Sequence, residues 1–351
     1  MTFKLAHVLT LTLAVLPLTA CGSDGDRPAR ACPADTPIGG SAALTPYPGP
    51  AGWIQGATWS PTTDVSGDLR RMRDDYAIDT VNVYGLETWS RSRLDEFFTA
   101  LTSLGMRAVV RLEAYDPATF AFRPEDAAEV LDRHRELLDY VRDRPVAYLA
   151  LNMPVDDPRV QARLGGVNSE LSARRQIAYA KELVALVRPH AGPAPVFVGL
   201  FYGWDGSYRI PSYRDSGADG YVLTSYSYPG GRVPRAGSSA EELIDAPRLR
   251  SAADRAVAAQ PGSPIVVEYG FQTLAGHGSM PDQTAGLVAD VTVKRAALRA
   301  TTHFYCSRYP AVIGTTYFGY NVFKAEGNPP RTLDYGLTPP PGTPRPAPSG
   351  R

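Results

Sequence analysis

The most informative segment of the chain reads Pro264-Ile265-Val266-Val267-Glu268-Tyr269-Gly270. Three consecutive β-branched residues follow a proline, and the segment stops at a glycine. This pattern is typical of a strand buried on both faces, and such strands belong to parallel sheets covered by helices. Glu268 stands where this strand ends. In a (β/α)8 barrel, acidic residues at the carboxyl ends of strands do the chemistry. We therefore predict such a barrel, with Glu268 as its principal functional carboxylate.

Seven other short apolar runs alternate with helical patterns along the chain. With the first segment, the predicted strands are Ile54–Trp59, Thr80–Tyr84, Ala108–Glu113, Val146–Asn152, Val196–Phe201, Gly220–Tyr226, Pro264–Glu268 and Val312–Tyr317. Apolar residues spaced i, i+3 and i+4 predict helices at Asp68–Tyr76, Ser92–Leu104, Pro124–Asp143, Ser169–Val187, Ser212–Ser216, Glu241–Gln260 and Thr284–Ser307. Eight parallel strands suffice to close a barrel, so the predicted fold is α/β, a single (β/α)8 TIM barrel.

A doubly wound open sheet is the structural alternative. That fold binds its ligand through a glycine-rich loop after an early strand, and no such loop is evident here. The weakest unit of the predicted barrel is the fifth, because its helix near Arg214 is short.

Composition sets limits on function. The chain has 351 residues, 44% of them hydrophobic, and 36 basic residues balance 36 acidic ones. A barrel typically needs ~250 residues, so one core domain fits this length. A neutral chain is not expected to bind nucleic acid or to be held electrostatically at a membrane. The five histidines are scattered without metal-ligand spacing, so we predict no metal and no cofactor.

The N-terminus is predicted to be an export signal. Lys4 precedes an apolar run, Val8–Ala20, that is too short to span a bilayer. The run ends in Leu18-Thr19-Ala20-Cys21, which resembles the lipobox of bacterial lipoproteins. This resemblance implies that Cys21 is lipidated and that the protein is extracytoplasmic, anchored to the cell membrane through its lipid alone. An ordinary secretory signal cleaved after Ala20 is the alternative.

These features divide the chain into four parts. We predict a signal peptide at residues 1–20, a flexible tether at 21–50, the barrel domain at 51–337 and a proline-rich disordered tail at 338–351. In an exported protein the remaining cysteines, Cys32 and Cys306, are expected to form a disulfide, with two free thiols as the alternative.

The predicted strand ends are rich in aromatic and amide side chains. Sugars suit such a surface, because their C–H faces stack on aromatic rings and their hydroxyl groups hydrogen-bond to polar side chains. We therefore predict a carbohydrate partner, although several of the aromatic residues could be ordinary core. The candidate substrate-binding residues are Trp59, Tyr84, Arg111, Tyr115, Asn152, Trp204, Tyr226, Tyr228 and Tyr317.

From Trp53 to Leu337 this pattern resembles the clan of retaining (β/α)8 glycoside hydrolases of the cellulase and β-glucanase type. The resemblance implies that Glu268 is the nucleophile and that Tyr226, or failing that Tyr228, hydrogen-bonds to it. It also implies an aromatic sugar platform at Tyr317 or Phe318.

The fourth predicted strand departs from this clan. The clan has Asn-Glu-Pro at its end, with the glutamate as acid/base, whereas this chain has Asn152-Met153-Pro154. A thioether cannot donate a proton. Candidate substitutes, in order, are Asp156, Asp205 and Glu113. Glu113 comes last because Arg111, on the same face of its strand, would keep it ionised.

Some of these residues also have structural interpretations. Asp156 could belong to a turn that caps a helix, and Arg111 with Glu113 could be a buried structural ion pair. The leading functional hypothesis is a glycoside hydrolase acting on a poly- or oligosaccharide through Glu268. The alternatives are a glycan-binding lipoprotein that has lost catalysis, favoured by Met153, and an envelope transglycosylase.

Overall fold

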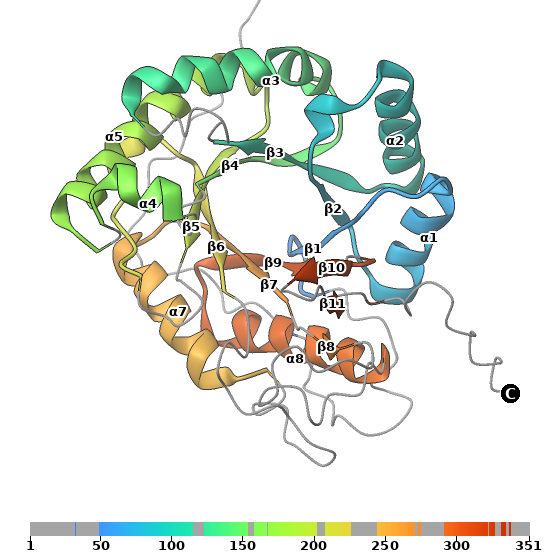
Figure 1. Cartoon of the computed structure of the whole chain (residues 1–351). Helices are drawn as coiled ribbons and strands as arrows, with labels where there is room; N and C mark the ends of the chain where they lie inside the picture. Colours follow the sequence, from blue (N-terminus) through green and yellow to red (C-terminus); the bar gives the residue numbers. More distant parts are fainter. Residues whose placement is uncertain are drawn as a thin grey trace, which may run out of the picture.

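Eight parallel strands close into a barrel in the order β1-β2-β3-β4-β5-β6-β7-β9 (Figure 1). The computed structural model describes residues 32, 49–114, 123–153, 158–166, 168–201, 208–225, 244–270, 273–274, 291–321, 323–326, 331–334 and 337. The barrel strands are β1 (Ile54–Thr58), β2 (Thr80–Val83), β3 (Arg107–Glu113), β4 (Val146–Asn152), β5 (Val196–Phe201), β6 (Gly220–Thr224), β7 (Ile265–Tyr269) and β9 (Val312–Phe318). The predicted (β/α)8 fold is confirmed.

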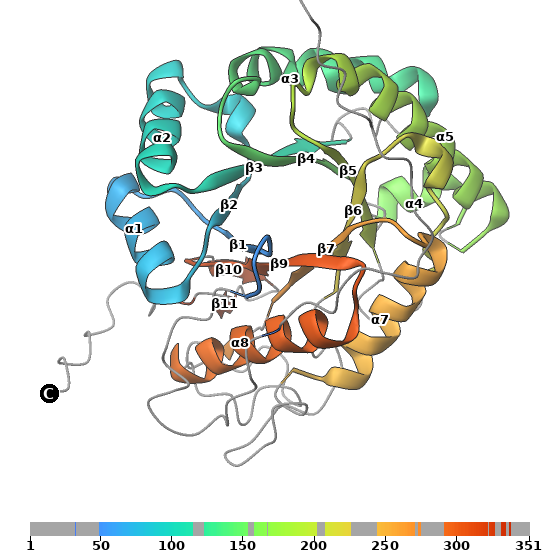
Figure 2. The same ribbon diagram turned by 180° about the vertical axis from the view of Figure 1, so that it is seen from behind.

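Helices surround the barrel in both views (Figures 1 and 2). They are α1 (Val65–Tyr76), α2 (Arg91–Leu104), α3 (Ala127–Val141), α4 (Pro158–Leu164), α5 (Glu170–Val187), α7 (Ala246–Ala259) and α8 (Val291–Arg308). Short 3-10 turns are η2 (Leu86–Thr88), η3 (Pro124–Asp126), η4 (Arg188–His190) and η5 (Arg214–Ser216). The short fifth helix expected near Arg214 is the single turn η5. Among the described helices, none is both long and apolar enough to cross a bilayer.

Some elements were not predicted. Helix α4 is only seven residues long. A small antiparallel sheet joins β8 (Thr273–Leu274), β10 (Phe323–Glu326) and β11 (Arg331–Asp334) in the order β10-β11-β8. Segments this short carry too few residues to show a helical or strand period. The signal peptide, most of the tether and the tail at 338–351 lie outside the described residues.

The barrel strands separate two cores. An inner core inside the barrel includes Ile54, Val109, Tyr148, Phe197, Val222 and Val266. A larger outer core, between barrel and helices, includes Val267 and Tyr269. Successive side chains on a strand face opposite sides. Glu268 therefore shares the inner face with Val266 and lies one layer closer to the carboxyl ends of the strands, which we call the mouth.

A disulfide joins Cys32 to Cys306, with the two Cα atoms 6.0 Å apart. This is the pairing expected from the cysteine count. Cys306 lies near the end of α8, a few residues before β9 begins, so the bond is at the amino-terminal end of the barrel, opposite the mouth.

Replacing both cysteines with serine is expected to lower the free energy of unfolding by about 2–4 kcal/mol. The physical reason is that the bond closes a loop across a sequence separation of 274 residues, which restricts the unfolded chain. Urea denaturation of the wild type and the double variant measures the difference. Reduced wild-type protein should match the double variant, and equal stability of the oxidised and reduced forms would contradict the prediction.

Candidate active site

Glu268 is a buried carboxylate near the end of β7, with 4% of the residue exposed. Two side chains from across the barrel donate hydrogen bonds to its Oε2 atom. Arg111 Nη1, from β3, lies 3.1 Å away, and Asn82 Nδ2, from β2, lies 3.5 Å away. A buried carboxylate needs such compensation for its lost hydration, so the site holds Glu268 in a defined position.

Arg111 connects the groups of the mouth. Its Nη1 atom also donates to the Tyr84 hydroxyl at 2.9 Å, and its Nε atom donates to Glu113 Oε1 at 3.1 Å. The centre of the guanidinium lies 4.2 Å from the centroid of the Tyr84 ring. One planar cation therefore binds two carboxylates and one phenol at once, a task to which its fixed fork of donors is suited.

Glu113 is the last residue of β3 and is paired in register with Asn152 of β4. Asn152 Nδ2 donates to Glu113 Oε2 at 2.6 Å, so both carboxylate oxygens of Glu113 accept hydrogen bonds. Two hydrogen bonds from the surrounding helices also hold the backbone at the end of β3. Arg133 Nη2 on α3 donates to the Glu113 carbonyl at 2.6 Å, and the Tyr179 hydroxyl on α5 donates to the carbonyl of Ala114.

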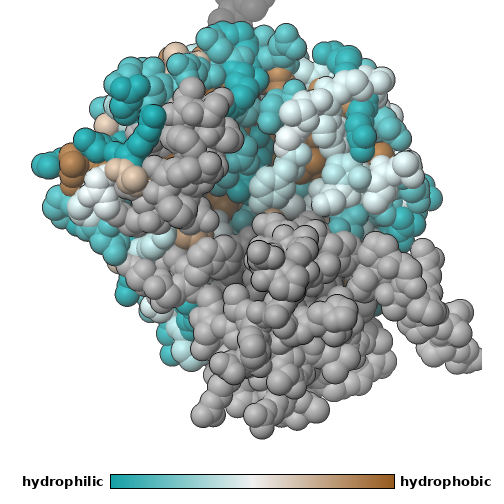
Figure 3. Space-filling model, in the orientation of Figure 1, coloured by the Kyte–Doolittle hydropathy of each residue, from teal (hydrophilic) through white to brown (hydrophobic). Residues whose placement is uncertain are grey.

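Tyr84 follows β2 at the mouth, and 40% of the residue is exposed to solvent. Among large hydrophobic residues in the described part of the chain, only Tyr84 and Leu171 are exposed. The coloured part of the surface in Figure 3 is accordingly mostly hydrophilic, with small separate hydrophobic patches. Arg111 lies over the Tyr84 ring and Phe318 meets it edge-on, at 6.2 Å between ring centroids. Tyr84 can therefore serve as a fixed platform for a sugar ring.

The structure corrects two of the predicted sugar-binding residues. Trp59 is buried, stacks on Phe97 and donates from Nε1 to Asp68 at 3.0 Å. Tyr317 is buried against Tyr269 in the outer core. The reason is strand alternation: Tyr317 is in register with Tyr269, the residue after Glu268, so both face the helices.

Met153 is also part of the outer core. The side chain at the end of β4 that contacts the site residues is that of Asn152, one residue earlier. The residue in place of the clan's acid thus lies outside the mouth.

Seven of the predicted residues lie outside the described part of the chain. Six are site residues, Tyr115, Asp156, Trp204, Asp205, Tyr226 and Tyr228, and the seventh is the predicted lipidation site Cys21.

Asn82 is a site residue that the sequence analysis did not select. It is buried, and besides Glu268 its Nδ2 atom donates to Thr58 Oγ1 at 3.1 Å. Its Oδ1 atom is buried without a hydrogen-bond partner among the described residues. The sequence did carry a signal for Asn82, because its amide lies within the apolar strand segment Thr80–Val83. A polar residue in a strand that is buried on both faces needs a specific hydrogen-bond partner.

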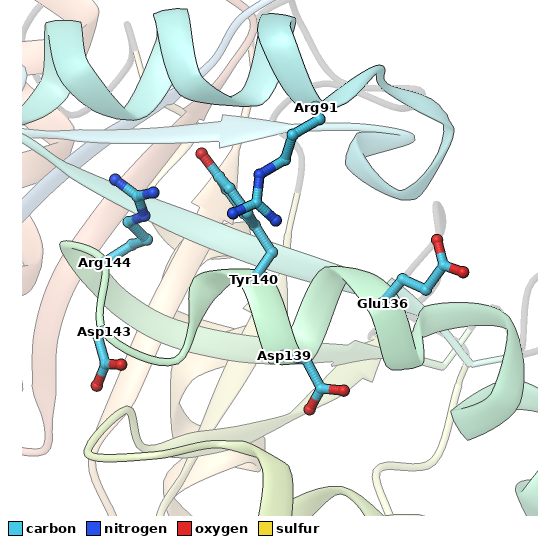
Figure 4. A pocket seen from close by; sticks show the side chains of 6 residues that line it. All are labelled: Arg91, Glu136, Asp139, Tyr140, Asp143 and Arg144. Carbon is cyan, nitrogen blue, oxygen red and sulfur yellow. The ribbon is translucent and has the colours of Figure 1, made fainter.

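A charged pocket lies elsewhere, between α2 and α3 (Figure 4), and is lined by Arg91, Glu136, Asp139, Tyr140, Asp143 and Arg144. The guanidinium groups of Arg91 and Arg144 lie 4.0 Å and 4.8 Å from the centroid of the Tyr140 ring. The Tyr140 hydroxyl donates to Asp95 at 2.8 Å, and burial raises the pKa of Tyr140 to about 12. The opposite charges of these residues compensate one another, and the residues lie on the outer helices. We therefore place the candidate site at the mouth of the barrel instead.

The wall behind Glu113 contains a buried histidine. His134 on α3 lies with Nδ1 2.8 Å from the carbonyl oxygen of Val130. Burial lowers the pKa of His134 below its ordinary value; Glu87 and Glu113 act in the opposite direction, and Arg133 adds to the lowering. His134 is therefore neutral in the folded protein at neutral pH.

This lowered pKa predicts a loss of stability in acid. As the pH falls below about 6.5, the unfolded chain takes up a proton at His134 before the folded protein does, which favours unfolding. The stability difference between wild type and His134→Gln should therefore shift against the wild type as the pH falls from 7.5 to 5. Denaturation curves across this range measure it, and a difference that is constant with pH would contradict the prediction.

Comparison with known proteins shows the fold. No family model and no curated protein sequence matches the chain. The solved structures that it resembles include Bacteroides uniformis β-glucuronidase 2, with a TM-score of 0.54, 13% identity, and coverage of 81% of this chain and 33% of that chain. A Thermotoga maritima β-glucosidase gives a TM-score of 0.53 and 12% identity, covering 81% of this chain and 92% of that chain. A Caldicellulosiruptor owensensis endo-1,4-β-xylanase gives a TM-score of 0.50 and 10% identity, covering 77% of this chain and 86% of that chain. The chain thus has a barrel similar to those of several glycoside hydrolases.

Proposed function

We propose that this protein cleaves glycosidic bonds in a poly- or oligosaccharide, with Glu268 as the nucleophile. The observation that carries the proposal is the state of Glu268, a buried carboxylate at the mouth that Arg111 and Asn82 hold from the opposite wall. Such placement aims a charged oxygen into the barrel at the level where these barrels carry their chemistry. The exposed Tyr84 ring supplies a surface on which a sugar can stack.

In the proposed reaction an oxygen of Glu268 bonds to the anomeric carbon while the bond to the leaving oxygen breaks, and a protonated acid gives that oxygen its proton. Water then attacks the same carbon, returning a proton to the acid and releasing Glu268. The outcome is retention of configuration.

Glu113 is poorly suited to be this acid. It and Glu268 bind different nitrogens of one planar guanidinium, Nε and Nη1, so Arg111 links the two carboxylates. Both oxygens of Glu113 also accept hydrogen bonds from N–H groups, so its carboxyl group is already engaged within the protein. We therefore propose Asp156 as the proton donor, with Asp205 second.

The test has two parts. Digests of neutral oligosaccharides are followed by proton NMR, and the first anomer released should have the configuration of the substrate. A 2-fluoro glycoside with a good leaving group should then label the enzyme, and peptide mass spectrometry should find the label on Glu268. Release of the opposite anomer, or a label on another residue, would overturn Glu268 as nucleophile.

A non-catalytic glycan-binding protein is the second candidate. The observation in its favour is that the described part of the mouth brings no carboxyl group near Glu268 other than Glu113, which is held by Arg111 and Asn152. It predicts saturable binding of oligosaccharides without product, and binding that survives replacement of Glu268 by glutamine.

We further propose that the protein is exported and anchored by a lipid on Cys21. The disulfide between Cys32 and Cys306 supports export, because such bonds persist in oxidising compartments. Intact mass measurement of the N-terminal peptide tests this, since a diacylglyceryl group on Cys21 is expected and an unmodified Cys21 would reject the anchor.

A further inference from the structure

Two carboxylates at the mouth share one guanidinium. Arg111 forms ion pairs with both Glu113 and Glu268. Its hydrogen bonds are directed at both carboxylates and at the Tyr84 hydroxyl. The guanidinium is thus already engaged within the protein.

The three charged side chains are buried to different degrees. The side chains of Glu268 and Arg111 are 6% and 12% exposed, whereas that of Glu113 is 28% exposed. The Glu113 carboxylate is therefore the most accessible of the three charged groups to an incoming ligand. Because these side chains are partly shielded from water, repulsion between like charges is screened less here than at an open surface.

The chain sequence places further acidic residues after the strands. The connections that follow β3, β4, β5, β6 and β7 contain nine acidic and four basic residues; they are residues 114–123, 153–157, 202–213, 225–245 and 270–290. The whole chain has equal numbers of both. Acidic residues therefore outnumber basic ones in these five connections.

We propose that the mouth selects its glycan by charge: it accepts neutral or amino-bearing sugars and rejects sugars that carry a carboxylate, sulfate or phosphate, with Glu113 as the residue that determines this specificity. This deepens the proposed function and rests on it. A sugar carboxylate at Tyr84 would face Glu113, and the guanidinium of Arg111 is already shared between Glu113 and Glu268. An ammonium group on the sugar would instead be attracted.

The overall fold does not decide this question. A β-glucuronidase and a β-glucosidase resemble the chain about equally, with TM-scores of 0.54 and 0.53.

Affinity measurements on matched sugars test the proposal. Oligosaccharides of the gluco, manno and galacto series are each used as the neutral, the 2-amino and the 6-carboxylate form, with full-length protein at 25 mM and 250 mM salt. In the series that binds, the carboxylate form should bind at least about tenfold more weakly than the neutral form, and the amino form at least as tightly. The difference should shrink at high salt.

Two variants locate the effect. Glu113→Gln should strengthen binding of the carboxylate form by about tenfold, because it frees part of Arg111 and removes the exposed charge. Glu136→Gln, the same change on the exposed side of α3, should leave all affinities unchanged.

Carboxylate binding by the wild type that equals or exceeds neutral binding would overturn the charge selection and leave the proposed function standing. Binding of no sugar in any series would overturn both. The wild-type comparison alone decides the selection, so the result holds even where Glu113→Gln fails to fold.

Discussion

Replacing Glu268 with glutamine is expected to lower the rate of glycoside cleavage by at least about a thousandfold. The amide has nearly the shape of the carboxylate, and its oxygen can still accept the hydrogen bonds from Arg111 and Asn82. It cannot attack an anomeric carbon, so the loss should appear in kcat. Initial rates on the best substrate of the wild type, with the thermal unfolding midpoint measured alongside, provide the test.

The Glu136→Gln variant is the matched control, because it makes the same change at an exposed site on α3. Its rate should equal that of the wild type. Adding azide to Glu268→Ala extends the test: azide should restore turnover and yield a glycosyl azide of inverted configuration, as expected where a small anion replaces a lost nucleophile. Unchanged activity of Glu268→Gln would rule out the proposed nucleophile.

Replacing Arg111 with methionine is expected to lower the free energy of unfolding by about 3 kcal/mol at pH 7 and to abolish activity. Methionine keeps much of the side-chain volume but leaves Glu268 buried beside Glu113 without their shared cation. Denaturant unfolding of the variant and the wild type at pH 7 measures the difference.

Arg135 provides a matched control for this prediction. It forms an exposed ion pair with Asp132 one turn away on α3, and such pairs contribute little to stability. Arg135→Met should therefore change the free energy of unfolding by less than about 0.5 kcal/mol. Equal effects of the two substitutions would show that Arg111 contributes no more to stability than an exposed arginine does.

The barrel itself could be predicted closely because its signal is repeated along the chain. Strands at Val146–Asn152 and Val196–Phe201 have the predicted bounds, since continuous apolar runs mark strands covered on both faces. Helix starts were less certain. Helix α1 begins at Val65, three residues before the predicted Asp68, because Asp64 caps it by accepting a hydrogen bond from the Gly67 amide.

The site could be predicted only in part. Glu268, Arg111, Glu113 and Asn152 do come together, because residues at the ends of parallel strands share one end of the barrel. Position at a strand end does not give the facing direction, which alternates with every residue. Tyr317 therefore lies among the helices. Val266 and Glu268 on the neighbouring strand face the inside of the barrel. This alternation would have shown that Tyr317 faces the helices, but only if the register between the two strands had been known.

The disulfide of Cys32 also fixes the polarity of the whole molecule. It attaches the N-terminal segment beside the end of α8, at the pole of the barrel away from Glu268. A chain held by its first residues would therefore present the mouth of the barrel away from the point of attachment. Cutting this one covalent bond would leave the barrel strands joined as before but would release Cys32 from α8.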